Sequence, residues 1–195
     1  MRRCGWGRNE PAPAVVTVAE DEDALEPADP LARLLAMFAR EGAVPSGHGA
    51  ALVVRLEERY ALRIPDDFRH YLLHIAPLQD VTDDEITCWF SPDRVRNMPE
   101  ELVDVNTGTY RPSTHPGIAA EENQYLVFAD YMIWCWGWAV CCSNGPNRGR
   151  VALIGDPDGF VADSFTEFVE RYLADPPGMA NTRAAPWRES SVTWQ

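Results

Sequence analysis

The chain has 195 residues, of which 46% are hydrophobic, and this length suits one domain with tails. Its formal net charge is −13, and its 17 cationic side chains are all arginines. The charge belongs to the body of the chain, because residues 31–175 hold 12 arginines against 22 acids. Such a surface matches neither nucleic acid nor anionic membranes, whose binding depends on cationic contacts. The lack of lysine excludes a Schiff base, a P-loop lysine and a lysine general base.

The cysteines and the N-terminal region indicate a cytoplasmic protein. No CxxC motif is present, so we expect small buried thiols in a reducing compartment and no metal or other cofactor. No run approaches the ~18 apolar residues of a membrane span. The N-terminal region also lacks the unbroken apolar stretch of a signal peptide. The five cysteines are Cys4, Cys88, Cys135, Cys141 and Cys142.

The first helix is predicted to begin at Asp29 and Pro30, an N-cap followed by a proline at the first helical position. Residues 1–28 before it are rich in proline, alanine and acids, and we expect a disordered arm. Gly42 ends the helical spacing. The apolar residues that recur at this spacing are Leu31, Leu34, Leu35 and Phe38.

The middle of the chain alternates helical patterns with a single strand pattern. Aspartates in the first turn favour a helix start after Pro65, because the helix dipole attracts anions there. Proline and glycine without a clear period indicate a loop later on. In order, we predict a helix over 48–61, a helix from Pro65 to Pro77, a strand over 86–90, a short helix over 92–102 and a loop over 104–121.

The C-terminal part predicts three strands and a final helix. The strands are expected at about 124–130, 135–142 and 150–155, with the turn SNGPNRG between the last two. Ser164 and Glu167 have the spacing of a capping box, which marks the start of the last helix. Helices, then clustered strands, then a helix predict an α+β fold. We expect one domain over 29–175, with helices packed on a twisted, mainly antiparallel sheet, and a tail over 176–195.

Patterns for catalysis are weak throughout. His70 and His74 are spaced like two metal ligands on a helix, but the sequence HYLLH lacks the glutamate of HExxH and a third ligand. No GxSxG, GxGxxG or GxxxxGK[ST] motif is present, and nothing brings serine, histidine and aspartate together. The acids at Asp83, Asp84 and Glu85 are expected in a polar loop, as an acidic contact patch rather than an acid–base pair. We therefore expect a protein that is not an enzyme.

Aromatic side chains are the more distinctive feature. Trp134, Trp136 and Trp138 alternate with small residues, so a strand would place three indoles on one face. An exposed indole ladder would suit a protein interface. The alternative is that most of these rings cover the core beneath helices, and Trp89 carries the same ambiguity.

Three segments resemble the SUKH superfamily, in particular the branch of a fungal regulator of cell-wall synthesis. LEERYALRIPDDFRHYLL resembles that family's helix–proline–helix start, and LVFAD resembles its Leu-x-Phe-Ala-Asp strand. GRVALIGD followed by VADSFTEFVERYL is similar to its closing strand and helix. The family usually has a glycine-rich turn after the Phe-Ala-Asp strand, where this chain has residues 131–134, YMIW.

The resemblance implies an α+β fold without catalytic activity, and many bacterial members are thought to be immunity proteins that neutralise a toxin. We therefore expect a protein-binding module, most specifically an immunity protein for a basic toxin. A scaffold protein without a toxin partner is the alternative, and the acidity then serves only solubility. The expected contact residues are Trp89, Trp134, Trp136, Trp138, Asp83, Asp84 and Glu85.

Overall fold

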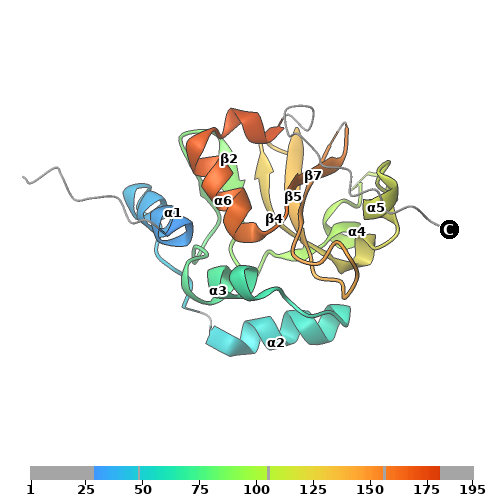
Figure 1. Cartoon of the computed structure of the whole chain (residues 1–195), viewed down its shortest axis with the longest axis horizontal. Helices are drawn as coiled ribbons and strands as arrows, with labels where there is room; N and C mark the ends of the chain where they lie inside the picture. The colour runs from blue at the N-terminus through green and yellow to red at the C-terminus, as the bar shows by residue number, and fades with distance from the viewer. Residues whose placement is uncertain (1–28, 48, 105, 156, 181–195) are drawn as a thin grey trace, which may run out of the picture.

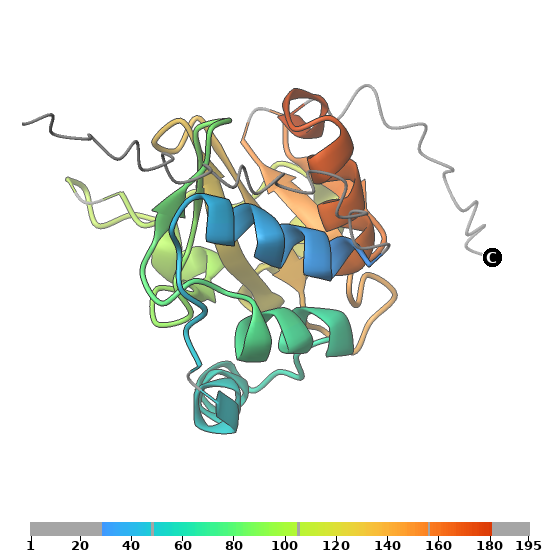
Figure 2. The same cartoon turned by 90° about the vertical axis from the view of Figure 1, so that its left-hand side faces the viewer.

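The structure is a computed structural model that describes residues 29–47, 49–104, 106–155 and 157–180. The predicted disordered arm and most of the predicted tail lie outside these residues. The described chain forms one seven-stranded sheet with helices on both sides (Figure 1). Seen from two directions, α1, α3 and α6 gather on one side, whereas α4 and α5 lie on the other (Figures 1 and 2). This arrangement confirms the predicted α+β class.

Every neighbouring pair of strands in the sheet is antiparallel. The strand order is β1-β2-β4-β5-β6-β7, and β3 pairs with β4 beside β2. The predicted strands at 124–130, 135–142 and 150–155 are confirmed as β4, β5 and β6, and the strand at 86–90 contains β2. The strands are β1 (Val81–Thr82), β2 (Thr87–Trp89), β3 (Arg96–Asn97), β4 (Tyr125–Tyr131), β5 (Trp136–Cys141), β6 (Val151–Ile154) and β7 (Gly159–Ala162).

The predicted helix boundaries follow from capping groups. The Asp29 side chain accepts a hydrogen bond from the Leu31 N–H at 3.2 Å, and Ser164 accepts one from the Glu167 N–H at 3.0 Å. Glu167 in turn accepts from the N–H of Asp163, one residue before the expected capping-box partner. The main helices are α1 (Pro30–Arg40), α2 (Gly49–Tyr60), α3 (Asp66–His74) and α6 (Phe165–Ala174).

The prediction fails between the first strand pattern and β4. The short helix expected over 92–102 is wrong in extent, because only α4 (Met98–Glu101) is helical and β3 precedes it. The α4 start is set by the Asn97 side chain, which accepts from the Glu100 N–H at 3.1 Å. The expected loop contains α5 (Pro116–Ala119) and leads into the 3₁₀ turn η1 (Glu122–Gln124). β1 and β3, with two residues each, are too short to give a strand pattern, and the four-residue β7 was also not predicted.

An aromatic core fills the space between α6 and the sheet. Trp89 of β2 meets Tyr172 of α6 edge-on, with ring centres 5.0 Å apart, and Trp138 of β5 lies 5.6 Å from Phe168. Phe128 of β4 lies between them, 5.2 Å from Phe168. All five rings are buried. The 3₁₀ turn η2 (Pro177–Ala180) continues the fold beyond α6, so burial extends past the expected domain limit at 175.

Candidate functional site

Asp83 organises the loop between β1 and β2 from inside the protein. One carboxylate oxygen accepts hydrogen bonds from the backbone N–H groups of Glu85 and Thr87, at 3.1 and 3.0 Å. The other accepts from Trp89 Nε1 at 2.9 Å and from the Tyr172 hydroxyl at 2.5 Å. The side chain is 7% exposed. Asp83 therefore joins the loop, the sheet and α6, and its expected role in an exposed acidic patch is wrong.

Burial also changes the assignment of two predicted contact residues. Trp89 is 0% exposed and Trp138 is 1% exposed, because both lie under α6. Side chains without accessible surface cannot touch a partner in the folded protein. Their role is to fill the core, as the alternative interpretation of the indole run allowed.

The predicted ladder of three indoles on one face does not form. Trp136 and Trp138 are in β5, but Trp134 precedes the strand, in the turn after β4. The Trp134 ring lies over Gly137, where an added Cβ would come within 2.8 Å of it. Successive residues of a strand face opposite sides of the sheet, so Gly137 faces away from Trp136 and Trp138. The Trp134 ring, which covers Gly137, therefore lies on the opposite face of the sheet from these two indoles. Trp136 stacks instead on Tyr131 of β4, with ring centres 4.5 Å apart.

The turn between β4 and β5 has an uncommon backbone. Met132, Ile133 and Trp134 have φ values of 46°, 54° and 65°, so three consecutive side-chain-bearing residues are left-handed. Each such residue costs roughly 1–2 kcal/mol, because Cβ approaches the following carbonyl oxygen. Glycine would avoid this cost. The turn nevertheless presents apolar side chains to solvent, with Met132 45% and Ile133 94% exposed.

One exposed apolar residue of a neighbouring turn, Ile86, meets this turn at the same end of the strands. Ile86 follows the Asp83 loop, has a φ of 63° and is 52% exposed. Its carbonyl oxygen accepts a hydrogen bond from the N–H of Met132 at 3.2 Å. Ile86, Met132 and Ile133 are called the apolar end of the sheet below. Together they form an apolar surface carried by two neighbouring turns.

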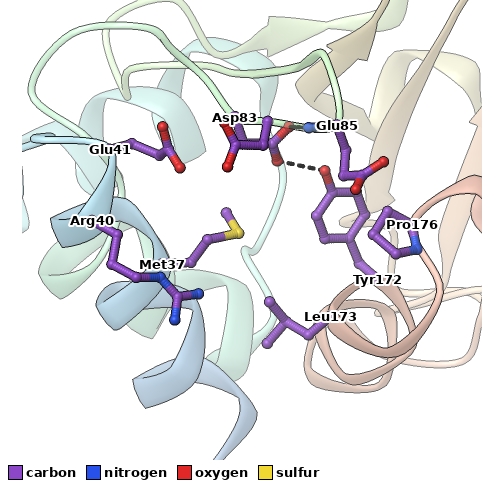
Figure 3. A pocket seen from close by; sticks show the side chains of 9 residues that line it. Met37, Arg40, Glu41, Asp83, Glu85, Tyr172, Leu173 and Pro176 are labelled. Carbon is purple, nitrogen blue, oxygen red and sulfur yellow. Dashed lines mark hydrogen bonds between the residues drawn. The ribbon is translucent and has the colours of Figure 1, made fainter. Parts of the chain in front are cut away.

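The acidic part of the predicted patch lies next to this apolar end. Asp84 and Glu85 are exposed and line a pocket of about 270 Å³ between α1 and the end of α6. Figure 3 shows the side chain of Glu41, the residue after α1, directed towards the loop, with Arg40 below it and Tyr172 on the other side of the pocket. No ion pair among the described residues involves Glu41, Asp84 or Glu85. Four acids and one arginine line the pocket, which therefore carries net negative charge.

A second charged cluster lies behind the apolar end, around Arg94. Its guanidinium is 2.8 Å from Asp80 and 3.4 Å from both Glu101 and Asp130, and it stacks over Phe90. Burial raises the pKa of Glu101 and of Asp130, and Arg94 offsets this only in part. Burial would also raise the pKa of Asp80, but hydrogen bonds from the Ser91 N–H and Arg94 outweigh it and lower that pKa. The cluster holds three acids around one cation.

Elsewhere in the described residues, histidine, serine and cysteine side chains are not arranged as in an active site. The His70 and His74 rings are exposed on α3 with centres 4.8 Å apart. Within the described residues, no group of three or more His, Cys, Asp or Glu side chains is arranged to hold a metal ion. Ser113 donates its hydroxyl proton to Asp158 at 2.6 Å, the wrong partner for a nucleophile that needs a histidine base. The described cysteines are free thiols: Cys88, Cys135, Cys141 and Cys142.

Comparison with known proteins adds no assignment. No protein-family model matches the chain, and no curated protein matches it in sequence. The resemblance to the SUKH superfamily therefore stays a prediction. Separately, none of the helices in the described part of the chain has the length and apolar character needed to cross a bilayer.

The apolar end and the Glu41 side of the pocket were not predicted from the sequence. The signal for the first was present in YMIW, an apolar run without glycine or proline between two strands. That run stood out only for Trp134 and as a replacement for the family's glycine-rich turn. Glu41 gave no signal, because only the packing of α1 beside α6 brings its carboxylate opposite the β1–β2 loop (Figure 3).

Proposed function

We propose that the protein is a non-catalytic binding module whose contact surface is the apolar end of the sheet with its acidic border. The observation that carries the proposal is the exposure of Ile86, Met132 and Ile133 on left-handed backbone. Exposed apolar side chains in an unfavourable conformation lower stability, so a use at an interface accounts for them. Asp84 and Glu85 beside them, and the net charge of −13, favour a basic partner.

The specific form of this proposal is an immunity protein that neutralises a basic toxin in the cytoplasm. The resemblance of three segments to SUKH proteins supports it, as does the acidic body of the chain. An apolar anchor surrounded by charge would give both affinity and fast encounter, because electrostatic attraction raises the association rate. A toxin-like reading frame beside the gene would add support.

Capture from the native host at low and then high salt tests the proposal. The tagged protein is compared with Ile133→Asp, which places a charge on the apolar end, and with Val54→Asp, a matched change at an exposed position on α2. We expect one basic protein to bind the unmodified chain and the Val54 variant, to be released by salt, and to be lost with Ile133→Asp.

Two results would contradict the proposal. Equal capture by both variants would remove the apolar end from the interface. Failure to capture any protein, or a salt-resistant set of ordinary cytoplasmic proteins, would favour the scaffold interpretation over toxin neutralisation. Protection of cells that co-express the captured toxin is the functional measurement that follows a positive result.

A further inference from the structure

Two chain segments enclose a groove at the edge of the sheet. Met37 and residues 40–44, at and after the end of α1, line one side, and residues 78–81 and 83–85, before and after β1, line the other. The segments run antiparallel and meet where the Leu78 N–H donates to the Val44 carbonyl oxygen at 2.7 Å. Beyond this contact they separate into two hollows of about 340 and 270 Å³, which share Glu41. Glu41 lines both hollows, which together are called the groove below, and the hollow of about 270 Å³ reaches Tyr172, Leu173 and Pro176 at the end of α6.

The groove combines apolar walls with acidic groups. Val44 is 62% exposed and Leu78 is 46% exposed at its closed end. Met37 and Leu173 provide apolar surface nearer α6. Five acids and one arginine line the two hollows, and of these acids Asp83 is bonded within the protein and Asp80 pairs with Arg94. The remaining acids are Glu41, Asp84 and Glu85, and among the described residues that line the hollows Arg40 is the single cation opposite them.

We infer that this groove binds an extended segment of the partner protein in which arginine or lysine side chains alternate with apolar ones. The inference rests on the proposed function and names the part of the partner that the groove takes. Cationic side chains would enter between Glu41 and Glu85, whose carboxylates form no ion pair within the described part of the chain. Apolar side chains would cover Val44 and Leu78.

An extended conformation follows from the position of the groove. β1 is the terminal strand of the sheet, so none of the described strands pairs with its outer edge. An extended peptide beside such an edge places successive side chains on opposite faces, which suits alternating cationic and apolar residues. Because β1 has only two residues, side-chain contacts in the two hollows, rather than a long backbone ladder, would provide most of the binding.

Binding of model peptides to the full chain tests the inference without the natural partner. The probe is a labelled peptide of four alternating arginine–leucine pairs, measured by fluorescence anisotropy and methyl NMR. The controls are a glutamate–leucine peptide of the same length and a peptide with four arginines followed by four leucines. We expect the alternating basic peptide to bind most tightly and to shift the methyl signals of Val44, Leu78 and Leu173.

Substitution of the charged groove residues should change the affinity for the peptide in a predictable direction and by a predictable amount. Glu41→Gln and Glu85→Gln should each weaken binding about two- to fivefold, the range of a single exposed ion pair. Arg40→Gln should strengthen binding, because it removes a guanidinium that would repel the arginine side chains of the peptide. Glu58→Gln, at an exposed position of α2 away from the groove, is the matched control and should leave affinity unchanged. Circular dichroism confirms that each variant is folded.

The inference and the proposed function fail in different experiments. Equal binding of the acidic peptide, methyl shifts outside the groove, or insensitivity to Glu41→Gln would overturn the groove inference. Shifts of the same methyl signals when the free protein is diluted would show that a second copy of the chain occupies the groove, and would overturn the inference as well. Ile133→Asp should keep peptide binding while it abolishes partner capture. Full capture of a host partner by Glu41→Gln together with Glu85→Gln would leave the proposed function standing and remove the groove from it.

Discussion

Apolar side chains lie in opposite environments beneath α6 and at the apolar end of the sheet. Beneath α6, Trp89 and Trp138 are buried among other aromatic rings, and Trp89 also donates a hydrogen bond to Asp83. At the apolar end, Ile133 is 94% exposed on a left-handed backbone. Burial of the rings beneath α6 stabilises the fold, whereas exposure and backbone strain at the apolar end lower its stability. Fold and contact surface are therefore carried by different hydrophobic residues.

Removal of the central indole should produce the largest loss of stability. We expect Trp89→Ala to lower the free energy of unfolding by about 3–5 kcal/mol, since it leaves a cavity among five aromatic rings. Urea denaturation followed by circular dichroism measures the change. Trp89→Phe, which keeps a ring but loses the bond to Asp83, should lose less. Equal stability of Trp89→Ala and the unmodified chain would contradict the aromatic core described here.

Neutralisation of the buried carboxylate should give the next largest effect. Asp83→Asn should lower the free energy of unfolding by about 2–3 kcal/mol, because an amide keeps one accepting oxygen and its NH2 group would face either the Trp89 and Tyr172 donors or the two backbone N–H donors. The exposed neighbour offers a matched control, and Asp84→Asn should change stability by less than about 0.5 kcal/mol. Similar losses in the two variants would show that Asp83 is not the organising residue.

The left-handed turn should respond with the opposite sign. Ile133→Gly should raise the free energy of unfolding by about 0.5–1 kcal/mol, because relief of backbone strain exceeds the entropy that glycine adds to the unfolded chain. Val54→Gly, at an exposed position inside α2, should lower it. Thermal unfolding of both variants checks the signs. A loss in both would mean that the turn carries no strain that glycine relieves.

The smallest effect is expected from Asp130, whose carboxylate accepts a hydrogen bond from the Trp134 N–H at 3.3 Å. Its pKa in the folded protein is raised above the ordinary value of 3.8 by burial. The folded state therefore binds the proton more tightly, and stability from this group is lost as pH rises above that value. Asp130→Asn should be more stable than the unmodified chain at pH 7, by about 1 kcal/mol or less.

The pH dependence separates this cause from a simple change in packing. The advantage of Asp130→Asn should shrink as pH falls towards 3.8, where the carboxyl group becomes protonated in both states. Urea denaturation at several pH values between 4 and 7 measures it. An advantage that stays constant across this range would point to packing around Trp134 instead of charge burial.

Local patterns were sufficient for most of the fold. The N-caps at Asp29 and Ser164 set the starts of α1 and α6, since hydrogen bonds between neighbours in sequence determine them. The strands β4, β5 and β6 were predicted because their apolar runs are bounded by turn signals. The strands β1, β3 and β7 were missed. The two residues of β1 and of β3 carry no period, whereas β7 has the same length as β6 and was missed although it pairs with that neighbouring strand.

The candidate site was accessible to the sequence only in part. The sequence by itself determined the acidic charge, the order of helices and strands, and the presence of an aromatic run before β5. The tertiary structure decided that Asp83 is buried, that Trp134 lies on the opposite face from Trp138, and that Ile133 stays exposed. The reason is that strand alternation assigns a face only within a regular strand. A left-handed turn breaks that alternation, and a buried carboxylate is stable only where distant donors such as Tyr172 reach it.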